Sequence, residues 1–120
     1  MPDSRRALGR WGEQVAADYL RENGYRIEET NYRCPRGEID IVARDGPVVA
    51  FVEVRTRRGL GHGTPQESVT PAKQRKLIEV SQTYLQEREL SDVDWRIDVV
   101  AISIDRGRPR IRLIRNAVSG

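Results

Sequence analysis

The sequence predicts an α/β protein in which helices flank a central mixed sheet. Two helical patterns and five strand patterns follow one another in the order helix, three strands, helix, two strands. This order is typical of a sheet that packs against helices. A chain of 120 residues is long enough to bury one hydrophobic core but too short for two, so residues 1–120 are expected to form a single domain.

Both helices are indicated by their periodicity and their ends. Apolar residues from Leu8 to Tyr19 recur at intervals of three and four, which predicts a helix over residues 5–23. Gly24 follows where a C-terminal cap is expected. Thr70 and Pro71 are typical of a cap residue and a first helical residue, and they predict a second helix that ends near residue 89.

The strand patterns lie between and after these helices. Residues 25–33 alternate weakly, as in an edge strand, and two apolar strands flank the turn "RDGP" at residues 38–43 and 48–54. The glycine-rich segment "RRGLGHGTPQES", residues 57–68, predicts a loop that acts as a lid. Residues 95–104 and 110–115 complete the sheet, and the arginines of the last strand are typical of a charged edge.

Composition excludes several classes of protein. A single cysteine, Cys34, rules out an internal disulfide and multi-cysteine zinc sites, and a single histidine, His62, rules out a two-histidine metal site. No segment has the apolar character of a signal peptide or a membrane span, so we expect a cytoplasmic protein without a membrane partner. A net charge of +3 permits a polyanionic partner without requiring one.

Charged residues interrupt the two central strands, although an unpaired buried charge is costly to desolvate. Alternation places Glu38 and Asp40 on one face of their strand, and Glu53 and Arg55 on one face of the next. A four-residue loop over "RDGP" is favoured because proline lacks an N–H. It predicts Asp40 opposite Phe51 and Glu38 opposite Glu53, and so puts all four charges on one face.

Two explanations of this charged face remain open from the residues alone. Clustered carboxylates repel, and two oxygen ligands close together are a usual way to bind Mg²⁺. Alternatively, the acids and Arg55 pair with one another on a sheet face that is exposed to water.

Asp40, followed on the next strand by Glu53-Val54-Arg55, resembles the signature of the PD-(D/E)xK nuclease superfamily. With "GRWGEQVAADYL" before it and "KQRKL" after it, the chain is similar over about residues 9–100 to the YraN-type family, which is related in fold to archaeal Holliday-junction resolvases. The resemblance implies a restriction-endonuclease-like αβββαβ core with acids at the bend of a central hairpin. It also implies a metal-dependent endonuclease that cleaves phosphodiester bonds of structured DNA, branched or damaged.

The resemblance assigns roles to individual residues. Asp40 and Glu53 match the metal-binding acids, and the carbonyl of Val54 matches a third ligand for Mg²⁺ or Mn²⁺. Glu13, at the margin of the apolar side of the first helix, matches an acid that completes such sites. Glu38 and Asp98 have no assigned role beyond support, and Asp98 is expected to pair with Arg96 or a helix lysine.

The sequence departs from the superfamily at two positions. Ile39 replaces a proline that has no chemical role. Arg55 replaces the usual lysine, and arginine effectively cannot lose its proton. Arg55 is therefore expected to orient water and to stabilise the charge that develops on phosphate. If the chemistry requires a neutral amine, the site is inactive.

Basic residues cluster after Glu53, and some of them lie at the start of the second helix, where the helix dipole disfavours cations. They are candidates for contacts with nucleic-acid phosphates, or else a solvated basic face: Arg57, Arg58, Lys73, Gln74 and Lys76.

Three classes of function follow from the sequence. The first is the endonuclease, and the second is a nucleic-acid-binding module with a degenerate, inactive nuclease site. The third is an interaction protein that does not bind nucleic acid. The likeness to resolvases suggests a homodimer only by analogy.

Overall fold

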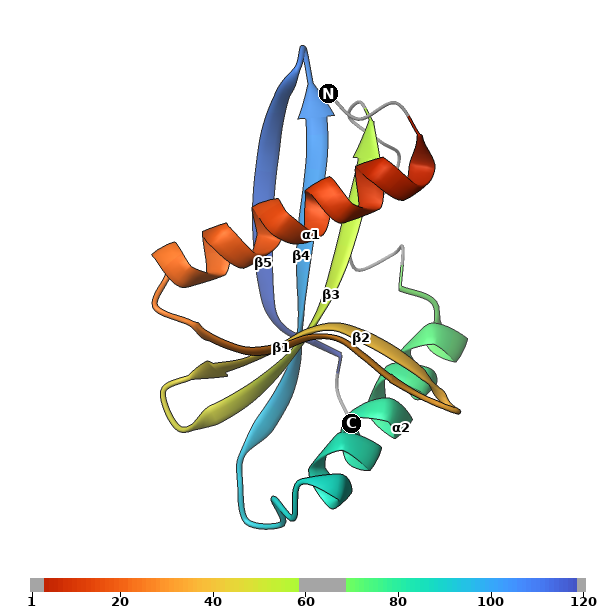
Figure 1. Ribbon diagram of the computed structural model, residues 1–120, viewed down its shortest axis with the longest axis vertical. Helices are drawn as coiled ribbons and strands as arrows, with labels where there is room; N and C mark the ends of the chain where they lie inside the picture. The colour runs from red at the N-terminus through yellow and green to blue at the C-terminus, as the bar shows by residue number, and fades with distance from the viewer. Residues whose placement is uncertain (1–3, 59–68, 119–120) are drawn as a thin grey trace.

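The predicted order of elements is confirmed by the computed structural model, which describes residues 4–58 and 69–118. The helices and strands are shown in Figure 1. They are α1 (Arg5–Glu22), β1 (Arg26–Cys34), β2 (Gly37–Asp45), β3 (Val48–Arg58), α2 (Pro71–Glu87), β4 (Trp95–Asp105) and β5 (Arg108–Val118). Most of the predicted glycine-rich loop, residues 59–68 with His62, lies outside the described residues, so the lid stays a prediction.

The strands form one mixed sheet in the order β1-β2-β3-β4-β5. β3 and β4 are parallel, and the other neighbours are antiparallel. The α/β class is therefore confirmed, and the arrangement is consistent with a restriction-endonuclease-like core. β1 and β5 are edge strands, as expected. The sheet is strongly twisted, so that β1 and β2 run across the direction of β4 and β5 in Figure 1.

A helix covers each face of the sheet. α1 packs through Ala16 and Leu20 on one face, and α2 packs through Leu77, Val80 and Tyr84 on the other. The described residues include no helix with the length and apolar character needed to cross a bilayer. Glu53 shares its strand face with Phe51, a core residue under α2. Glu53 is only 6% exposed and Asp40 only 9%, so these two acids do not lie on a water-exposed face as the alternative explanation expected.

The β2–β3 turn is tighter than the sequence suggested. Asp45 pairs with Val48, so that Gly46 and Pro47 alone form the loop, and Gly46 has a φ of 59°. Positive φ at the first turn position suits a two-residue hairpin, and a proline at the second needs no N–H there. The expected four-residue loop was wrong, and Phe51 pairs with Val42 instead of Asp40. Because the register moved by two residues, the predicted faces are unchanged.

α1 approaches β3 very closely at Gly12. A Cβ atom built on Gly12 would lie 2.0 Å from Thr56 Oγ1, a distance at which real atoms overlap. Glycine at this position therefore permits the contact between helix and strand. The contact holds the next residue, Glu13, beside the point where β2 leaves β3.

Candidate active site

The site forms where β2 and β3 separate. Their ladder runs from Asp45–Val48 to Ile41–Val52 and then ends. The N–H of Val54, the next group on β3 to face β2, donates instead to Asp40 Oδ2 at 2.8 Å. The Asp40 carboxylate thus replaces a strand partner and occupies the bend of the hairpin, as the resemblance implied.

The structure brings Asp40 and Glu53 together. Asp40 and Glu53 each lie one residue beyond Ile41–Val52, the last pair of the ladder, whereas the longer loop would have set them diagonal to one another. Both acids line a cavity of about 450 Å³ between β3 and the start of α1. Its described lining also includes Glu13, Val54, Arg55 and Arg57.

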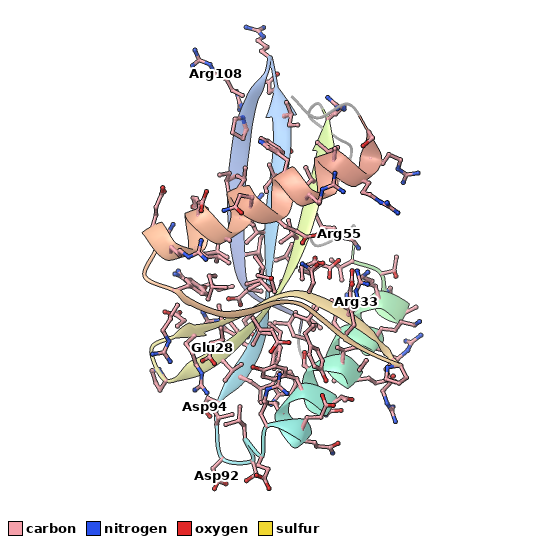
Figure 2. The ribbon with its side chains drawn as sticks, viewed as in Figure 1. Glu28, Arg33, Arg55, Asp92, Asp94 and Arg108 are labelled. Atoms are coloured by element: carbon pink, nitrogen blue, oxygen red, sulfur yellow. The ribbon has the colours of Figure 1, made fainter. Side chains whose placement is uncertain are left out.

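Two cations lie beside the acids. Arg55 Nε is 3.8 Å from Glu53 Oε1, and its side chain is about one third exposed. Lys73 Nζ, from the first turn of α2, is 3.5 Å from the same oxygen. The sequence had assigned Lys73 only to phosphate binding, because its contact with Glu53 depends on how α2 packs against β3. In Figure 2 Arg55 lies between the two helices.

Burial and mutual repulsion govern the protonation of the acids. Burial, followed by the charge of Glu53, raises the pKa of Asp40 to about 7, against the opposing hydrogen bond from the N–H of Val54. The charge of Glu13 also raises the pKa of Asp40. Burial raises the pKa of Glu53 as well, while Lys73 and Arg55 oppose the shift. Near neutral pH the pair therefore carries less negative charge than two ordinary carboxylates.

The donor atoms suit a hard divalent cation. Asp40 and Glu53 offer carboxylate oxygens, and the N–H of Val54 points to the β2 edge. The N–H and C=O of one strand residue face the same edge, so the carbonyl of Val54 also faces the acids. Within residues 4–58 and 69–118, no three His, Cys, Asp or Glu side chains form a ready cluster of metal ligands. Two carboxylates and one carbonyl suit Mg²⁺, which retains several waters.

The other predicted residues divide between the cavity and its surroundings. Arg57 lines the cavity. Arg58 lies on the other face of β3, where it pairs with Ile104 of β4. Gln74 Nε2 donates to the carbonyl of Val69 at 2.9 Å, so it fastens the start of α2. Lys76 lines a separate hollow at the β1–β2 turn.

Glu38 also lies outside the cavity lining. Its Oε2 accepts from Arg33 Nε at 2.8 Å across the β1–β2 hairpin, and the side chain is 43% exposed. Its expected place opposite Glu53 was wrong, because the tighter β2–β3 turn puts Asp40 there instead.

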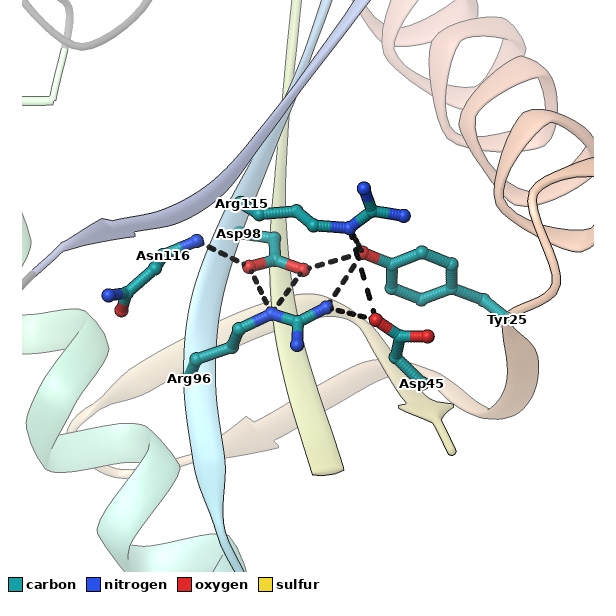
Figure 3. Close-up of polar contacts among 6 residues, drawn as sticks. All are labelled: Tyr25, Asp45, Arg96, Asp98, Arg115 and Asn116. Carbon is teal, nitrogen blue, oxygen red and sulfur yellow. Dashed lines mark hydrogen bonds and ion pairs between the residues drawn. The ribbon is translucent and has the colours of Figure 1, made fainter. Parts of the chain in front are cut away.

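Asp98 belongs to a separate buried network (Figure 3). It is fully buried and accepts from Arg96 Nε at 2.9 Å, which confirms the predicted pairing with Arg96. It also accepts from Tyr25 Oη at 2.9 Å and from the N–H of Asn116 at 2.8 Å. Sequence patterns did not identify Tyr25 or Asn116 as partners, since they are far from Asp98 in the chain.

Comparison with known proteins identifies the family of this chain. The uncharacterised protein family UPF0102 matches residues 12–102. A UPF0102 protein of Dehalococcoides mccartyi is 46% identical over 118 residues, which cover 98% of both chains. One from Syntrophotalea carbinolica is 52% identical over 102 residues, covering 85% of this chain and 83% of its own. One from Syntrophus aciditrophicus is 51% identical over 109 residues, covering 91% and 86%. This chain belongs to the UPF0102 family.

Proposed function

We propose that this protein is a metal-dependent endonuclease that cleaves phosphodiester bonds in structured, branched or damaged DNA. The observation that carries the proposal is the pairing of two buried carboxylates, Asp40 and Glu53, in a cavity that also holds cationic side chains. Paired buried acids are costly to keep ionised unless a cation joins them. This arrangement supports membership of the PD-(D/E)xK superfamily, which the sequence resembles.

Each residue has a chemical task in this proposal. Asp40, Glu53 and the carbonyl of Val54 would hold Mg²⁺ or Mn²⁺, which supplies Lewis acidity toward the phosphate and the attacking water. Arg55 is placed to stabilise charge that develops on the phosphate oxygens. Glu13, which lines the same cavity from α1, would accept a hydrogen bond from the water. Hydrolysis would join the water oxygen to phosphorus as one ester P–O bond breaks, with one proton leaving the water and one proton reaching the departing ester oxygen.

Lys73 could replace the lysine that the superfamily usually carries at the position of Arg55. The superfamily usually carries a lysine where this chain has Arg55, and an arginine cannot serve as a neutral amine. Lys73 brings a primary amine to the same carboxylate, 3.5 Å from Glu53 Oε1, from a different element of the fold. We infer that Lys73 takes the role of that lysine and that the site is active.

The proposal is tested by cleavage of labelled branched DNA in Mg²⁺, in Mn²⁺ and in chelator. Wild type should cleave only with metal, and Glu53→Gln should lose cleavage while still binding DNA. Glu38→Gln is the matched control, because Glu38 lies on the same hairpin but outside the cavity lining. Cleavage that survives in Glu53→Gln would refute the assignment of Glu53.

A second readout does not need activity. Millimolar Mg²⁺ should raise the melting temperature of the wild type, because a ligand that binds only the folded state stabilises it. Asp40→Ala should abolish that rise, and Glu38→Gln should keep it. An equal rise in Asp40→Ala would place the ion elsewhere.

The second candidate is a nucleic-acid-binding module with a degenerate site. Arg55 in the lysine position favours it, as does the small number of clustered metal ligands in the described residues. It predicts salt-sensitive DNA binding by the wild type without cleavage, across several divalent metals and DNA structures.

A further inference from the structure

Next to the cavity, and sharing Arg55, Arg57 and Ala101 with its lining, the sheet has a basic surface that we call the arginine face. It lies on the same side of the sheet as Glu53 and continues away from α2. Strand register defines it: on β4, Ala101 pairs with Arg55 and Arg112, and Ser103 pairs with Arg57 and Arg110. Arg108 is the first residue of β5 and lies opposite Asp105. The arginine face thus consists of Arg55, Arg57, Arg108, Arg110 and Arg112 around Ala101 and Ser103.

The character of this side of the sheet changes abruptly at Glu53. Phe51, Val99 and Ile114 pack in the core with α2. Past Glu53, the same side of the sheet carries arginines on β3 and β5, and Ala101 and Ser103 on β4 between them. The opposite side of the same strands stays apolar under α1, through Val100, Ile102, Ile111 and Leu113. The change of character is therefore confined to one side.

We call the arginine face a trough because its middle strand carries short side chains between arginines on the two outer strands. Its floor, Ala101 and Ser103, has short side chains, and arginine rows from β3 and β5 flank it at about 5 Å per strand spacing. Arg108, Arg110 and Arg112 are exposed. Figure 2 shows Arg55 near the middle of the molecule and Arg108 at the far tip of the β4–β5 hairpin, so the trough leads from the cavity outward.

Protection of a sheet edge explains these features only in part. Charged residues do block unwanted strand pairing, and lysine is the usual choice. Here every cation of the trough is arginine, whose planar fork binds phosphate oxygens in pairs. Edge protection also gives no reason for a floor of small residues between two basic rows. Asp105, the acid opposite Arg108 at the margin of this surface, forms an ion pair with Arg110 at 3.3 Å.

We propose that the arginine face seats the sugar–phosphate backbone of a duplex DNA arm and guides it to the Asp40–Glu53 cavity. This inference rests on the proposed nuclease function and extends it to a binding surface. The trough residues include no aromatic side chain on which unpaired bases could stack, so it suits backbone phosphates rather than splayed bases. Recognition through phosphates carries little sequence preference.

The test compares two double variants that each remove two positive charges. Arg108→Ala with Arg112→Ala alters the trough without touching the cavity lining. The control, Arg21→Ala with Arg26→Ala, removes side chains that are 55% and 78% exposed, at the end of α1 and the start of β1. Binding of a labelled duplex is measured by fluorescence anisotropy in chelator at several salt concentrations, and thermal melting verifies folding.

The trough variant should bind about tenfold or more weakly at low salt. Its slope of log affinity against log salt should fall by about 1.8, since each lost phosphate contact removes about 0.9. The control should keep the wild-type slope. Equal salt slopes for both variants would refute the proposal that the arginine face binds DNA.

Because chelator prevents metal-dependent cleavage, the result does not depend on the chemistry. Loss of binding by the trough variant alone would support the arginine face even if the wild type cleaves nothing. Cleavage that depends on Glu53, together with an unchanged slope in the trough variant, would uphold the nuclease and reject the trough.

Discussion

At the scale of single residues, the acids of the cavity are set by the alternation of strand side chains. Alternation placed Asp40 and Glu53 on one face from sequence alone, because that conclusion needs only the parity of the loop. Whether the two acids are opposite or diagonal depends on turn length, and Pro47 misled the choice because it occupies a turn position that needs no N–H. The contact of Lys73 with Glu53 could not be predicted, since it depends on the packing of α2.

The raised pKa of Asp40 predicts a pH-dependent cost of folding in the absence of metal. Its pKa is about 7 in the folded protein and 3.8 ordinarily, so the folded state binds the proton more tightly. The resulting stabilisation is complete below about pH 4 and is lost as the pH rises through 7. Asp40→Asn should remove this dependence. At pH 8 it should exceed the wild type in stability by on the order of 2–4 kcal/mol.

Urea unfolding of both proteins in chelator from pH 4 to 8 measures this difference. Because other groups also titrate, the informative quantity is the free energy of unfolding of the variant minus that of the wild type. This difference should grow with pH between about 4 and 7. A difference that is constant across the range would show that Asp40 keeps an ordinary pKa.

Replacement of Lys73 separates its role from that of a general phosphate contact. Lys73→Met should reduce cleavage by about 10²-fold, as loss of one stabilising group in a site typically does. The rise in melting temperature with Mg²⁺ should persist, because the proposed ligands remain. Lys76→Met, on the same helix but facing the β1–β2 turn, should cleave almost normally. Equal losses of cleavage in the two variants would show that Lys73 acts only as an ordinary phosphate contact.

At the scale of elements, helix and strand assignments followed closely from periodicity and capping. Ser4 Oγ caps α1, and Thr70 Oγ1 caps α2 as the sequence indicated. The strands proved longer than their apolar cores, as for β5, which spans Arg108–Val118 against the expected residues 110–115. Strand ends are fixed by pairing with neighbours, which a local pattern does not record.

The close contact of α1 with β3 predicts opposite effects for two glycines on one helix. Gly12→Ala would place a Cβ 2.0 Å from Thr56 Oγ1, and such overpacking costs about 1–3 kcal/mol. The higher helix propensity of alanine offsets at most about 1 kcal/mol of this cost. Among the described residues, no atom lies within 4 Å of the Cβ that Gly9→Ala would add, so this variant should gain stability from propensity alone.

Thermal and urea unfolding of the two alanine variants provide the measurement. Gly12→Ala should be less stable than the wild type, and Gly9→Ala should be more stable by about 0.5–1 kcal/mol. If Gly12→Ala were also stabilising, α1 would not need this close approach to hold Glu13 beside the acids.

At the scale of the whole molecule, one polar network joins elements that are distant in the chain (Figure 3). Arg96 Nη2, on β4, donates to Asp45 at the end of β2 at 2.6 Å and to Tyr25 Oη before β1 at 2.9 Å. Arg115 Nε, on β5, donates to the same Tyr25 oxygen at 3.1 Å. Sequence predicted only the Arg96–Asp98 pair, because the other partners meet through the sheet.

Asp98 is the centre of this network, and its replacement should destabilise the whole fold. The carboxylate is fully buried, and Asn116, with a φ of 53°, donates its N–H to it where the β4–β5 register shifts. Asp98→Asn removes the buried acid that pairs with Arg96 Nε and leaves Arg96 with Asp45 alone, and breaking a buried ion pair costs about 3–5 kcal/mol. Asp105→Asn, near the exposed end of β4, is the control and should change stability by no more than about 0.5 kcal/mol.

Urea unfolding followed by both tryptophan fluorescence and far-ultraviolet circular dichroism checks this prediction. Trp95 and Trp11 pack against different faces of the sheet, so fluorescence reports on both layers. If Asp98 joins the layers, its variant should lose stability in both signals together, because β4 contributes to both cores. A loss below about 1 kcal/mol would show that the network is replaceable, since removal of one partner from a buried ion pair normally costs several times more.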